Sequence, residues 1–269
     1  MRAVKLVLKI VLTLVALLVI AAGGLYLSVF AGKPAIPGGL RLGDVEVVKD
    51  GYVSAFLIDV GPREVALVDA GNDERAGAIM AALQRRGLGP EAVTTILLTH
   101  GDVDHTKGAR AFPRATVMAL AADVDLAEGK VGRGPIGRPG PRGFKVGRVL
   151  RDGESLDLHG ARVDVFAIAG HTPGSAAYLA KGVLFLGDSA EAERSGRLAA
   201  ATWLFCSDRP RNRASLVELA QRLAPRAAEV TAIATAHSGV LSRGLAPLTE
   251  LAARTRCGGS GGGSGGDSA

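Results

Sequence analysis

The distribution of apolar positions along the chain predicts an alternation of strands and helices. Short apolar runs rich in β-branched residues are typical of buried strands. Such runs predict strands over residues 45–48, 53–59, 65–69, 93–99, 116–120, 155–158, 162–169, 176–180, 183–186 and 230–235. Apolar positions at helical spacing predict helices over residues 74–86, 121–128 and 213–223. Each half of the chain is strand-rich first and then bears helices, so we expect two sheets packed face to face with helices outside.

A long apolar segment precedes these elements. No charged residue occurs from Ile10 to Gly32, a run of 23 residues, and a helix needs about 20 apolar residues to span a bilayer. Arg2, Lys5 and Lys9 lie before it, and positive charge marks the cytoplasmic side. We therefore expect residues 1–33 to form a single-pass membrane anchor, with the N-terminus in the cytoplasm and everything after Lys33 extracytoplasmic, in the periplasm or at the cell surface. A cleaved signal peptide and a buried core helix are the alternatives.

The composition of the chain after residue 33 predicts a linker, one domain and a tail. After a short linker over residues 34–39, residues 40–254 are expected to form one domain, and the Gly- and Ser-rich residues 255–269 a flexible tail. Hydrophobic residues make up 48% of the chain, so this domain can bury a sizeable core. Aromatic residues make up only 4%, which gives little support to a base-stacking surface for nucleic acid.

The positive charge of the chain changes this picture little. The formal net charge is +6, but three of these charges flank the apolar segment, and the +3 that remains is a weak field for a domain of this size. A nucleic-acid partner is therefore not expected. Positive charge is dense only between Gly132 and Arg148, where basic residues alternate with Gly and Pro. This segment is either a solvated flexible loop or a lid that recognises an anionic substrate.

A group of metal-capable side chains follows the predicted strand over residues 93–99. His100, Asp102, Asp104 and His105 crowd into six positions. Imidazole nitrogen and carboxylate oxygen both suit zinc, iron or manganese. The alternative is a polar turn that caps a helix. The four residues indicate a metal site at a strand end, where α/β proteins tend to gather their chemistry.

Further ligands must come from elsewhere in the chain, because four residues on one short loop cannot all converge on one ion. Three more metal-capable residues follow predicted strands, namely His171, Asp188 and His237. Four of the five histidines then lie at strand ends beside three aspartates, which strengthens the prediction of a metal site. The fifth histidine, His159, lies in a turn and is expected at the surface.

The order of these motifs resembles that of the metallo-β-lactamase superfamily of hydrolases. The matching segments are Asp69-Ala70-Gly71, His100 to His105, Gly170-His171-Thr172-Pro173-Gly174-Ser175, Gly187-Asp188 and His237. The resemblance covers about residues 40–254. It implies an α/β fold, a four-layer αββα sandwich with a dinuclear metal centre in the cleft between the sheet edges.

The resemblance also implies a role for each residue of the centre. The ligand sets that it implies are His100, Asp102 and His171 for one metal and Asp104, His105 and His237 for the other. Asp188 would bridge the two ions, and Asp69 would support a loop without being a ligand. Asp104 has a second candidate role, as the catalytic residue that orients the attacking hydroxide or handles its proton.

Asp102 departs from the usual family pattern, His-x-His-x-Asp-His. A carboxylate still ligates zinc, but it is a harder donor with a negative charge, which moves the metal preference towards manganese or iron. It also makes a bound water less acidic. We expect two divalent ions, zinc first, with manganese or iron as alternatives. A second hypothesis is that Asp102 is not a ligand and that the first site is weak or empty. The Asp variant is similar to the one in the metallo-β-lactamase-like domain of competence-type DNA uptake channels.

The predicted function is metal-dependent hydrolysis of a small molecule by an activated water. The motifs from Gly170 to Asp188 resemble the arrangement of small single-domain hydrolases in this superfamily, which favours an ester, thioester, lactone or β-lactam substrate. A phosphodiester, including nucleic acid, is the alternative favoured by Asp102 and the basic loop. A non-catalytic, membrane-tethered metal-binding domain is the third hypothesis.

Overall fold

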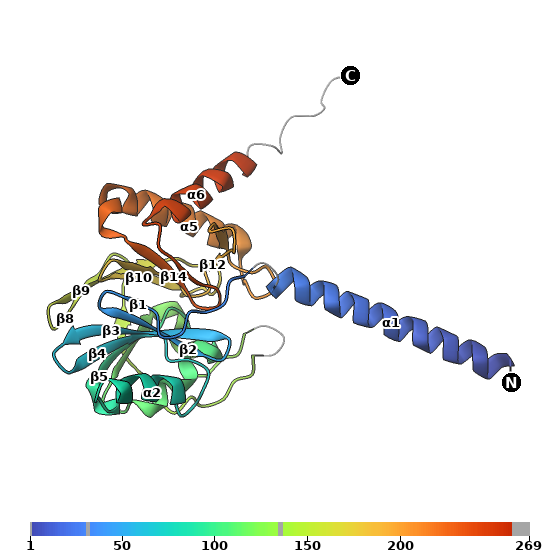
Figure 1. Cartoon of the computed structure of the whole chain (residues 1–269), viewed down its shortest axis with the longest axis horizontal. Helices are drawn as coiled ribbons and strands as arrows, with labels where there is room; N and C mark the ends of the chain where they lie inside the picture. The colour runs from blue at the N-terminus through green and yellow to red at the C-terminus, as the bar shows by residue number, and fades with distance from the viewer. Residues whose placement is uncertain (1, 31–32, 134–136, 260–269) are drawn as a thin grey trace, which may run out of the picture. The chain divides into compact units, whose positions relative to one another are not determined.

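The computed structural model describes residues 2–30, 33–133 and 137–259, and the chain divides into two units between Lys33 and Pro34. The first unit consists of helix α1 (Arg2–Phe30) (Figure 1). Its segment Val4–Leu27 has 24 residues and a mean hydropathy of 2.7, and among the described residues it is the one helix that is long and apolar enough to cross a membrane. This segment is exposed, so the core-helix alternative is wrong. Its length and composition suit an anchor and a signal sequence alike.

The second unit contains a seven-stranded sheet in which the strands follow their order along the chain. Its strands are β1 (Arg41–Leu42), β2 (Val45–Asp50), β3 (Val53–Gly61), β4 (Glu64–Val68), β5 (Val93–Leu97), β6 (Thr116–Leu120) and β7 (Val146–Leu150). Neighbouring strands are antiparallel from β1 to β4 and parallel from β4 to β7. The carboxyl ends of β4, β5 and β6 therefore lie at one edge of this sheet.

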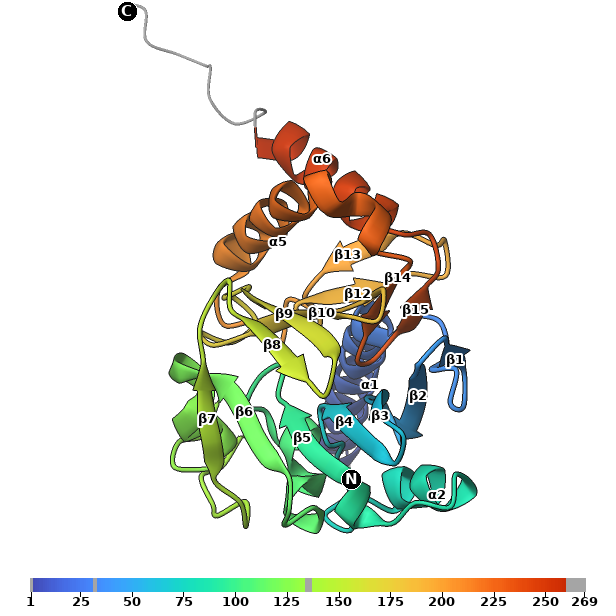
Figure 2. The ribbon, with the colours of Figure 1, turned by 90° about the vertical axis from the view of Figure 1, so that its left-hand side faces the viewer.

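A six-stranded sheet lies against the first, in the order β15-β14-β11-β10-β9-β8 (Figure 2). Its strands are β8 (Ser155–Leu158), β9 (Ala161–Ala167), β10 (Ala176–Ala180), β11 (Val183–Phe185), β14 (Ala232–Thr235) and β15 (Gly239–Leu241). The pair β11 and β14 is parallel, and the other pairs are antiparallel. A separate hairpin joins β12 (Ala190–Ala192) to β13 (Leu198–Ala200).

Three apolar clusters hold four layers together. Between the sheets, the ring of Phe56 packs 5.1 Å from that of Phe185, measured between centroids. Helix α2 (Gly77–Arg85) buries Ile79 and Leu83 on the outer face of the first sheet. Helices α5 (Arg209–Leu223) and α6 (Ala246–Gly259) cover the outer face of the second sheet. The expected four-layer αββα sandwich is confirmed.

Some elements differ from those that the apolar pattern predicts. The helix expected over residues 121–128 is a 3₁₀ turn followed by the single turn α4 (Val124–Ala127). Helix α5 begins at Arg209, earlier than predicted, because the Asp208 side chain accepts a hydrogen bond from the Arg211 N–H. Strand β7 lies at the end of the segment expected to be a loop and is mostly exposed. Helix α6 continues to Gly259, and residues 260–269 of the expected tail lie outside the described residues.

Hydrogen bonds join the two sheets at the edge where the predicted site residues lie. The Ala176 N–H donates to the Thr99 carbonyl at 2.7 Å. The buried Tyr178 hydroxyl donates to the Leu98 carbonyl at 2.7 Å. The Ser54 N–H donates to the Ala236 carbonyl at 2.8 Å. These hydrogen bonds fix the position of one sheet relative to the other at this edge.

Candidate metal centre

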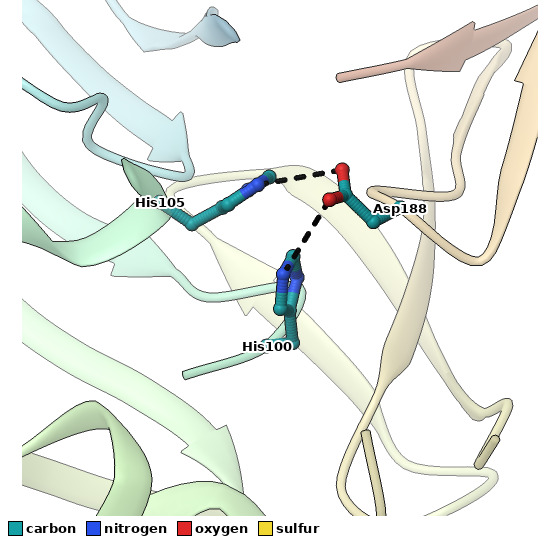
Figure 3. A group of neighbouring side chains, drawn as sticks. All are labelled: His100, His105 and Asp188. Atoms are coloured by element: carbon teal, nitrogen blue, oxygen red, sulfur yellow. Dashed lines mark ion pairs between the residues drawn. The ribbon is translucent and has the colours of Figure 1, made fainter. Parts of the chain in front are cut away.

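The seven predicted metal ligands lie together at the common edge of the two sheets. They come from the segments that follow β5, β9, β11 and β14, and Asp104 and His105 lie in the short helix after β5. Their donor atoms form three groups, each within 4.8 Å, namely His100 with Asp102 and His171, Asp104 with His105 and His237, and His100 with His105 and Asp188. Figure 3 shows His100 and His105 from the first sheet pointing toward Asp188 from the second. The site is therefore assembled across the sheet interface.

The group formed by Asp104, His105 and His237 is termed the second triad. The Nε2 atom of His237 lies 3.4 Å from Asp104 Oδ2 and 3.1 Å from Asp188 Oδ2. The Nε2 atom of His105 lies 3.3 Å from Asp188 Oδ1 and 3.9 Å from Asp104 Oδ2. Both imidazoles thus present Nε2 to the same two carboxylates.

The group formed by His100, Asp102 and His171 is termed the first triad. The Oδ2 atom of Asp102 lies 3.4 Å from His100 Nε2 and 3.3 Å from His171 Nε2. Asp188 Oδ2 lies 3.9 Å and 3.7 Å from the same two nitrogens. Asp188 therefore stands between the triads. Asp102 occupies the N-cap position of α3 (Val103–Thr106), but its side chain makes no capping hydrogen bond. The helix-cap interpretation of this aspartate is therefore wrong.

Neighbouring groups fix the orientation of three imidazoles. His237 Nδ1 lies 2.8 Å from the Tyr52 carbonyl, His105 Nδ1 lies 2.8 Å from Asp69 Oδ2, and His100 Nδ1 lies 3.0 Å from Thr99 Oγ1. A carbonyl or carboxylate oxygen can only accept, so Nδ1 of His237 and His105 carries the proton. In the neutral ring, Nε2 of each has a lone pair directed into the centre, as a metal ligand requires.

Asp69 supports the centre from a fully buried position behind it. Its carboxylate accepts hydrogen bonds from the N–H and the hydroxyl of Thr99, both at 2.7 Å, and from His105. Its backbone lies in the left-handed region, at φ 58°, which Asp and Asn tolerate better than other non-glycine residues. Asp69 thus links the end of β4 to the loop that carries the histidines and does not face the triads.

The carboxylates raise the pKa values of two histidines. Burial alone lowers the pKa of His105, but Asp188, Asp69 and Asp104 outweigh burial and hold this pKa well above its usual value. The pKa of His237 is also raised, against burial, chiefly by Asp188. Conversely, burial raises the pKa of Asp188, but His237 and His105 outweigh it and hold that pKa well below its usual range. The cluster therefore favours bound positive charge.

The donor atoms fit a divalent cation. Nε2 of His100, Nε2 of His105 and Oδ1 of Asp188 are buried and make no hydrogen bond to the described residues. Leaving a buried polar atom without a partner costs about 1–3 kcal/mol. Imidazole nitrogens and carboxylate oxygens are the ligands that zinc, iron and manganese take from proteins. A bound metal ion would give these buried donor atoms the partner that they lack.

Asp123 is a supporting residue that the sequence analysis missed. Its buried carboxylate accepts hydrogen bonds from the Gly101 N–H and the Gly174 N–H, both at 2.7 Å, and from the Thr172 hydroxyl at 2.8 Å. It therefore ties the loop of His100 to the loop of His171. No local signal marked it, because it lies in a segment that the apolar pattern assigned to a helix.

Arg133 is a second missed residue, although it lies in the basic segment that the sequence singled out. Its guanidinium forms a two-pronged ion pair with Asp102. Burial raises the pKa of Asp102, but His100, His171 and Arg133 outweigh burial and hold this pKa well below its usual range. Burial lowers the pKa of Arg133, and Asp102 outweighs it. His159, by contrast, is exposed and pairs with Glu64 at 3.1 Å.

Comparison with known proteins agrees with the fold and the motifs. The family model of the metallo-beta-lactamase superfamily matches residues 48–234, which is more than half of the chain. The chain is similar to the hydroxyacylglutathione hydrolase of Synechococcus sp., with 32% identity over 175 residues that cover 61% of this chain. The match covers 59% of that enzyme, so the chain spans less than two thirds of its length.

Two solved structures show the same architecture. A metallo-beta-lactamase family protein from Thermus thermophilus has a TM-score of 0.58 and 27% identity, with 80% of each chain covered. A B3 metallo-beta-lactamase with an active-site glutamic acid has a TM-score of 0.62 and covers 84% of this chain and 90% of its own. Its identity is 22%, so that likeness concerns the fold alone. The chain belongs to the metallo-beta-lactamase superfamily of metallo-hydrolases.

Proposed function

We propose that the chain is a metal-dependent thioester hydrolase. The observation that carries the proposal is the convergence of four histidines and three aspartates from four segments of the chain, with donor atoms 3.1–3.9 Å apart. The similarity to a hydroxyacylglutathione hydrolase supports a thioester as the substrate. Among the ester, thioester, lactone and β-lactam substrates expected from the sequence, we therefore propose a thioester as the substrate.

The chain offers two sets of donor atoms for a divalent ion. The second triad with Asp188 would hold an ion, and the first triad presents a similar set of donors that Arg133 also contacts. A divalent ion at this centre supplies Lewis-acid chemistry, because it lowers the pKa of a water and polarises the carbonyl oxygen of a thioester. Asp69, Thr99 and the Tyr52 carbonyl keep the histidine rings in the orientation that binding requires.

Asp104 is the residue proposed to handle the proton of the attacking water. Its Oδ2 atom lies 3.4 Å from His237 Nε2, and its side chain retains 21% exposure. A partly exposed carboxylate can accept a proton at the centre and release it to solvent. A thiolate is a good leaving group and needs little protonation, so the chain requires no separate general acid for a thioester.

We further propose that helix α1 tethers this hydrolase to a membrane. Support comes from the 24-residue apolar segment and from the basic residues Arg2, Lys5 and Lys9 before and within its first turns. Positive charge at this end favours a cytoplasmic N-terminus and a catalytic domain on the other side. Hydrolysis of a small thioester would then take place outside the cytoplasm.

A substrate panel tests the proposed function. The zinc-loaded full chain in detergent is assayed on a hydroxyacyl thioester of glutathione, on nitrocefin and on bis-nitrophenyl phosphate. We expect the highest kcat/KM on the thioester. His105→Ala, which removes a donor, should lower this value at least about 100-fold. His159→Asn is the matched control, because it changes an exposed histidine at φ 53° to a residue that tolerates that backbone.

The other substrates decide between the alternatives. A preference for bis-nitrophenyl phosphate would replace the thioesterase with a phosphodiesterase of the same fold. Turnover of none of the three, by protein that binds metal, would favour the non-catalytic metal-binding domain. Equal activity of His105→Ala and the parent would contradict a metal mechanism at this centre.

A further inference from the structure

Arg133 is held in the centre by contacts that use most of its guanidinium. Nε donates to Asp102 Oδ1 at 2.9 Å, and Nη2 contacts Asp102 Oδ2. Nη1 donates to the Phe205 carbonyl at 2.6 Å, and to the His171 carbonyl and the Ser207 hydroxyl at 3.2 Å each. The side chain is 19% exposed. Paired arginine and carboxylate forks are both strong and specific in geometry, so Arg133 is a built part of the site.

The terminal nitrogen Nη2 of Arg133 contacts two donor atoms of the first triad. Nη2 lies 3.1 Å from His171 Nε2 and contacts Asp102 Oδ2. These are two of the three donor atoms of that triad. A ligated metal lies only about 2 Å from such donors. An ion bound by both atoms would lie in contact with the positively charged Nη2 or closer, so we expect the first triad to hold the guanidinium or a metal but not both.

The second triad has no such occupant among the described residues. Among the described residues, His237 Nε2 and His105 Nε2 form ion pairs with Asp104 and Asp188. We therefore expect these carboxylates to attract a cation from solution. The two triads differ in this respect although both consist of two histidines and one aspartate.

Arg133 supplies part of the positive charge that the carboxylates of the centre attract. Asp102, Asp104 and Asp188 lie among the donor atoms, Asp69 contacts His105 from behind, and Arg133 pairs with Asp102. A dication held by Asp102 would lie beside the guanidinium, and the two positive charges would repel each other.

Backbone hydrogen bonds hold described residues near Arg133 in the sequence. The Lys130 N–H donates to the Asp125 carbonyl, and the Gly140 N–H donates to the Gly129 carbonyl, both at 2.8 Å. The residues that precede Arg133 are thus tied to the turn that follows α4.

We propose that Arg133 is the resident cation of the first triad and that the enzyme binds one divalent metal, at the second triad with Asp188. The inference rests on the metal-dependent hydrolysis proposed above and assigns Arg133 as a positioning residue that excludes the first metal. It also explains why Asp102 replaces the histidine expected there, because a carboxylate can pair with a guanidinium and an imidazole cannot do so in the same way.

Metal stoichiometry tests this assignment without relying on activity. Metal-free full chain in detergent is titrated with Co²⁺, followed by its visible absorbance, and the zinc content of separately loaded protein is counted by elemental analysis. The parent should saturate at about one equivalent, and Arg133→Met and Arg133→Ala at about two. Arg138→Ala, an exposed arginine of the same segment, should saturate like the parent. Two substitutions of different size guard against loss of folding, which thermal unfolding monitors.

The outcomes separate this inference from the proposed function. About two equivalents in the parent would overturn the role of Arg133 and leave metal-dependent hydrolysis intact. About one equivalent in both Arg133 variants, with their fold retained, would also overturn it. Absence of bound metal in the parent would contradict the proposed function itself.

Discussion

Asp69 illustrates how one buried residue sets the properties of a metal ligand. It accepts hydrogen bonds from Thr99 and lies 2.8 Å from His105 Nδ1, while its own side chain is fully buried. The carboxylate fixes the imidazole ring and makes Nε2 a better donor. Its effect on the metal is therefore indirect but large.

Replacing Asp69 should weaken metal binding without removing a ligand. In Asp69→Asn the amide keeps the size and tolerates the positive φ, but it loses the negative charge that supports His105. We expect the metal affinity to fall by about 10- to 100-fold, measured by competition with a chromophoric chelator. Asp44→Asn, at an exposed aspartate, is the control and should bind like the parent. Unchanged affinity in Asp69→Asn would show that Asp69 has no such role.

The seven clustered residues could be predicted because each is a metal-capable side chain directly after an apolar strand. Strand ends gather at sheet edges, so sequence position implied spatial proximity. Arg133 and Asp123 could not be predicted in their roles. Arg133 reaches Asp102 from 31 residues away, and the path of a Gly- and Pro-rich segment is not encoded in any periodicity. Asp123 acts through backbone N–H groups, which every residue except proline possesses.

At the scale of elements, Glu128 joins the end of α4 to the start of β7. Its carboxylate accepts a hydrogen bond from the Val146 N–H at 3.0 Å, and Lys145 and Lys130 approach it at 3.1 Å each. Burial raises the pKa of Glu128, but the Val146 N–H and the two lysines outweigh burial and lower it from 4.5 to about 2. Glu128 thus ties the end of α4 to the start of β7.

This ionised carboxylate should make stability depend on pH. A carboxyl group with a lowered pKa in the folded state stabilises the fold above its ordinary pKa of 4.5, and the contribution is lost as the pH falls from 4.5 towards about 2. We expect the unfolding free energy of the metal-free parent to fall more between about pH 5 and about pH 3 than that of Glu128→Gln, measured by urea unfolding. Glu74→Gln, at an exposed pair, should follow the parent. Parallel pH profiles for the parent and Glu128→Gln would refute this.

The elements themselves were predictable to different degrees. Long apolar strands such as β3 and helix α2 follow from periodicity, because one face or both faces are buried. Strand β7 shows the burial pattern of an exposed edge, so its residues carry no apolar run. Strands β12 and β13 have only three residues each, too few for a periodic signal. These two strands form by pairing with each other, which the local sequence pattern does not reveal.

At the scale of the whole molecule, the apolar segment Val4–Leu27 is the basis of the proposed membrane tether. If it is an uncleaved anchor, the full chain should remain in the membrane fraction after washes with high salt and with carbonate, because its apolar surface is far larger than a peripheral contact provides. Protease added to spheroplasts should digest the catalytic domain from outside. Soluble mature protein that lacks these residues would show signal cleavage, and protection until lysis would reverse the proposed topology.

The account as a whole depends on metal-dependent thioester hydrolysis at the edge shared by the two sheets. The most direct test is to assay one preparation of the full chain on a hydroxyacyl thioester of glutathione when loaded with zinc, after chelation, and after zinc is restored. Bound metal is counted in each sample. The rate should fall with the bound metal and return with it. A rate that persists in metal-free protein would contradict the account.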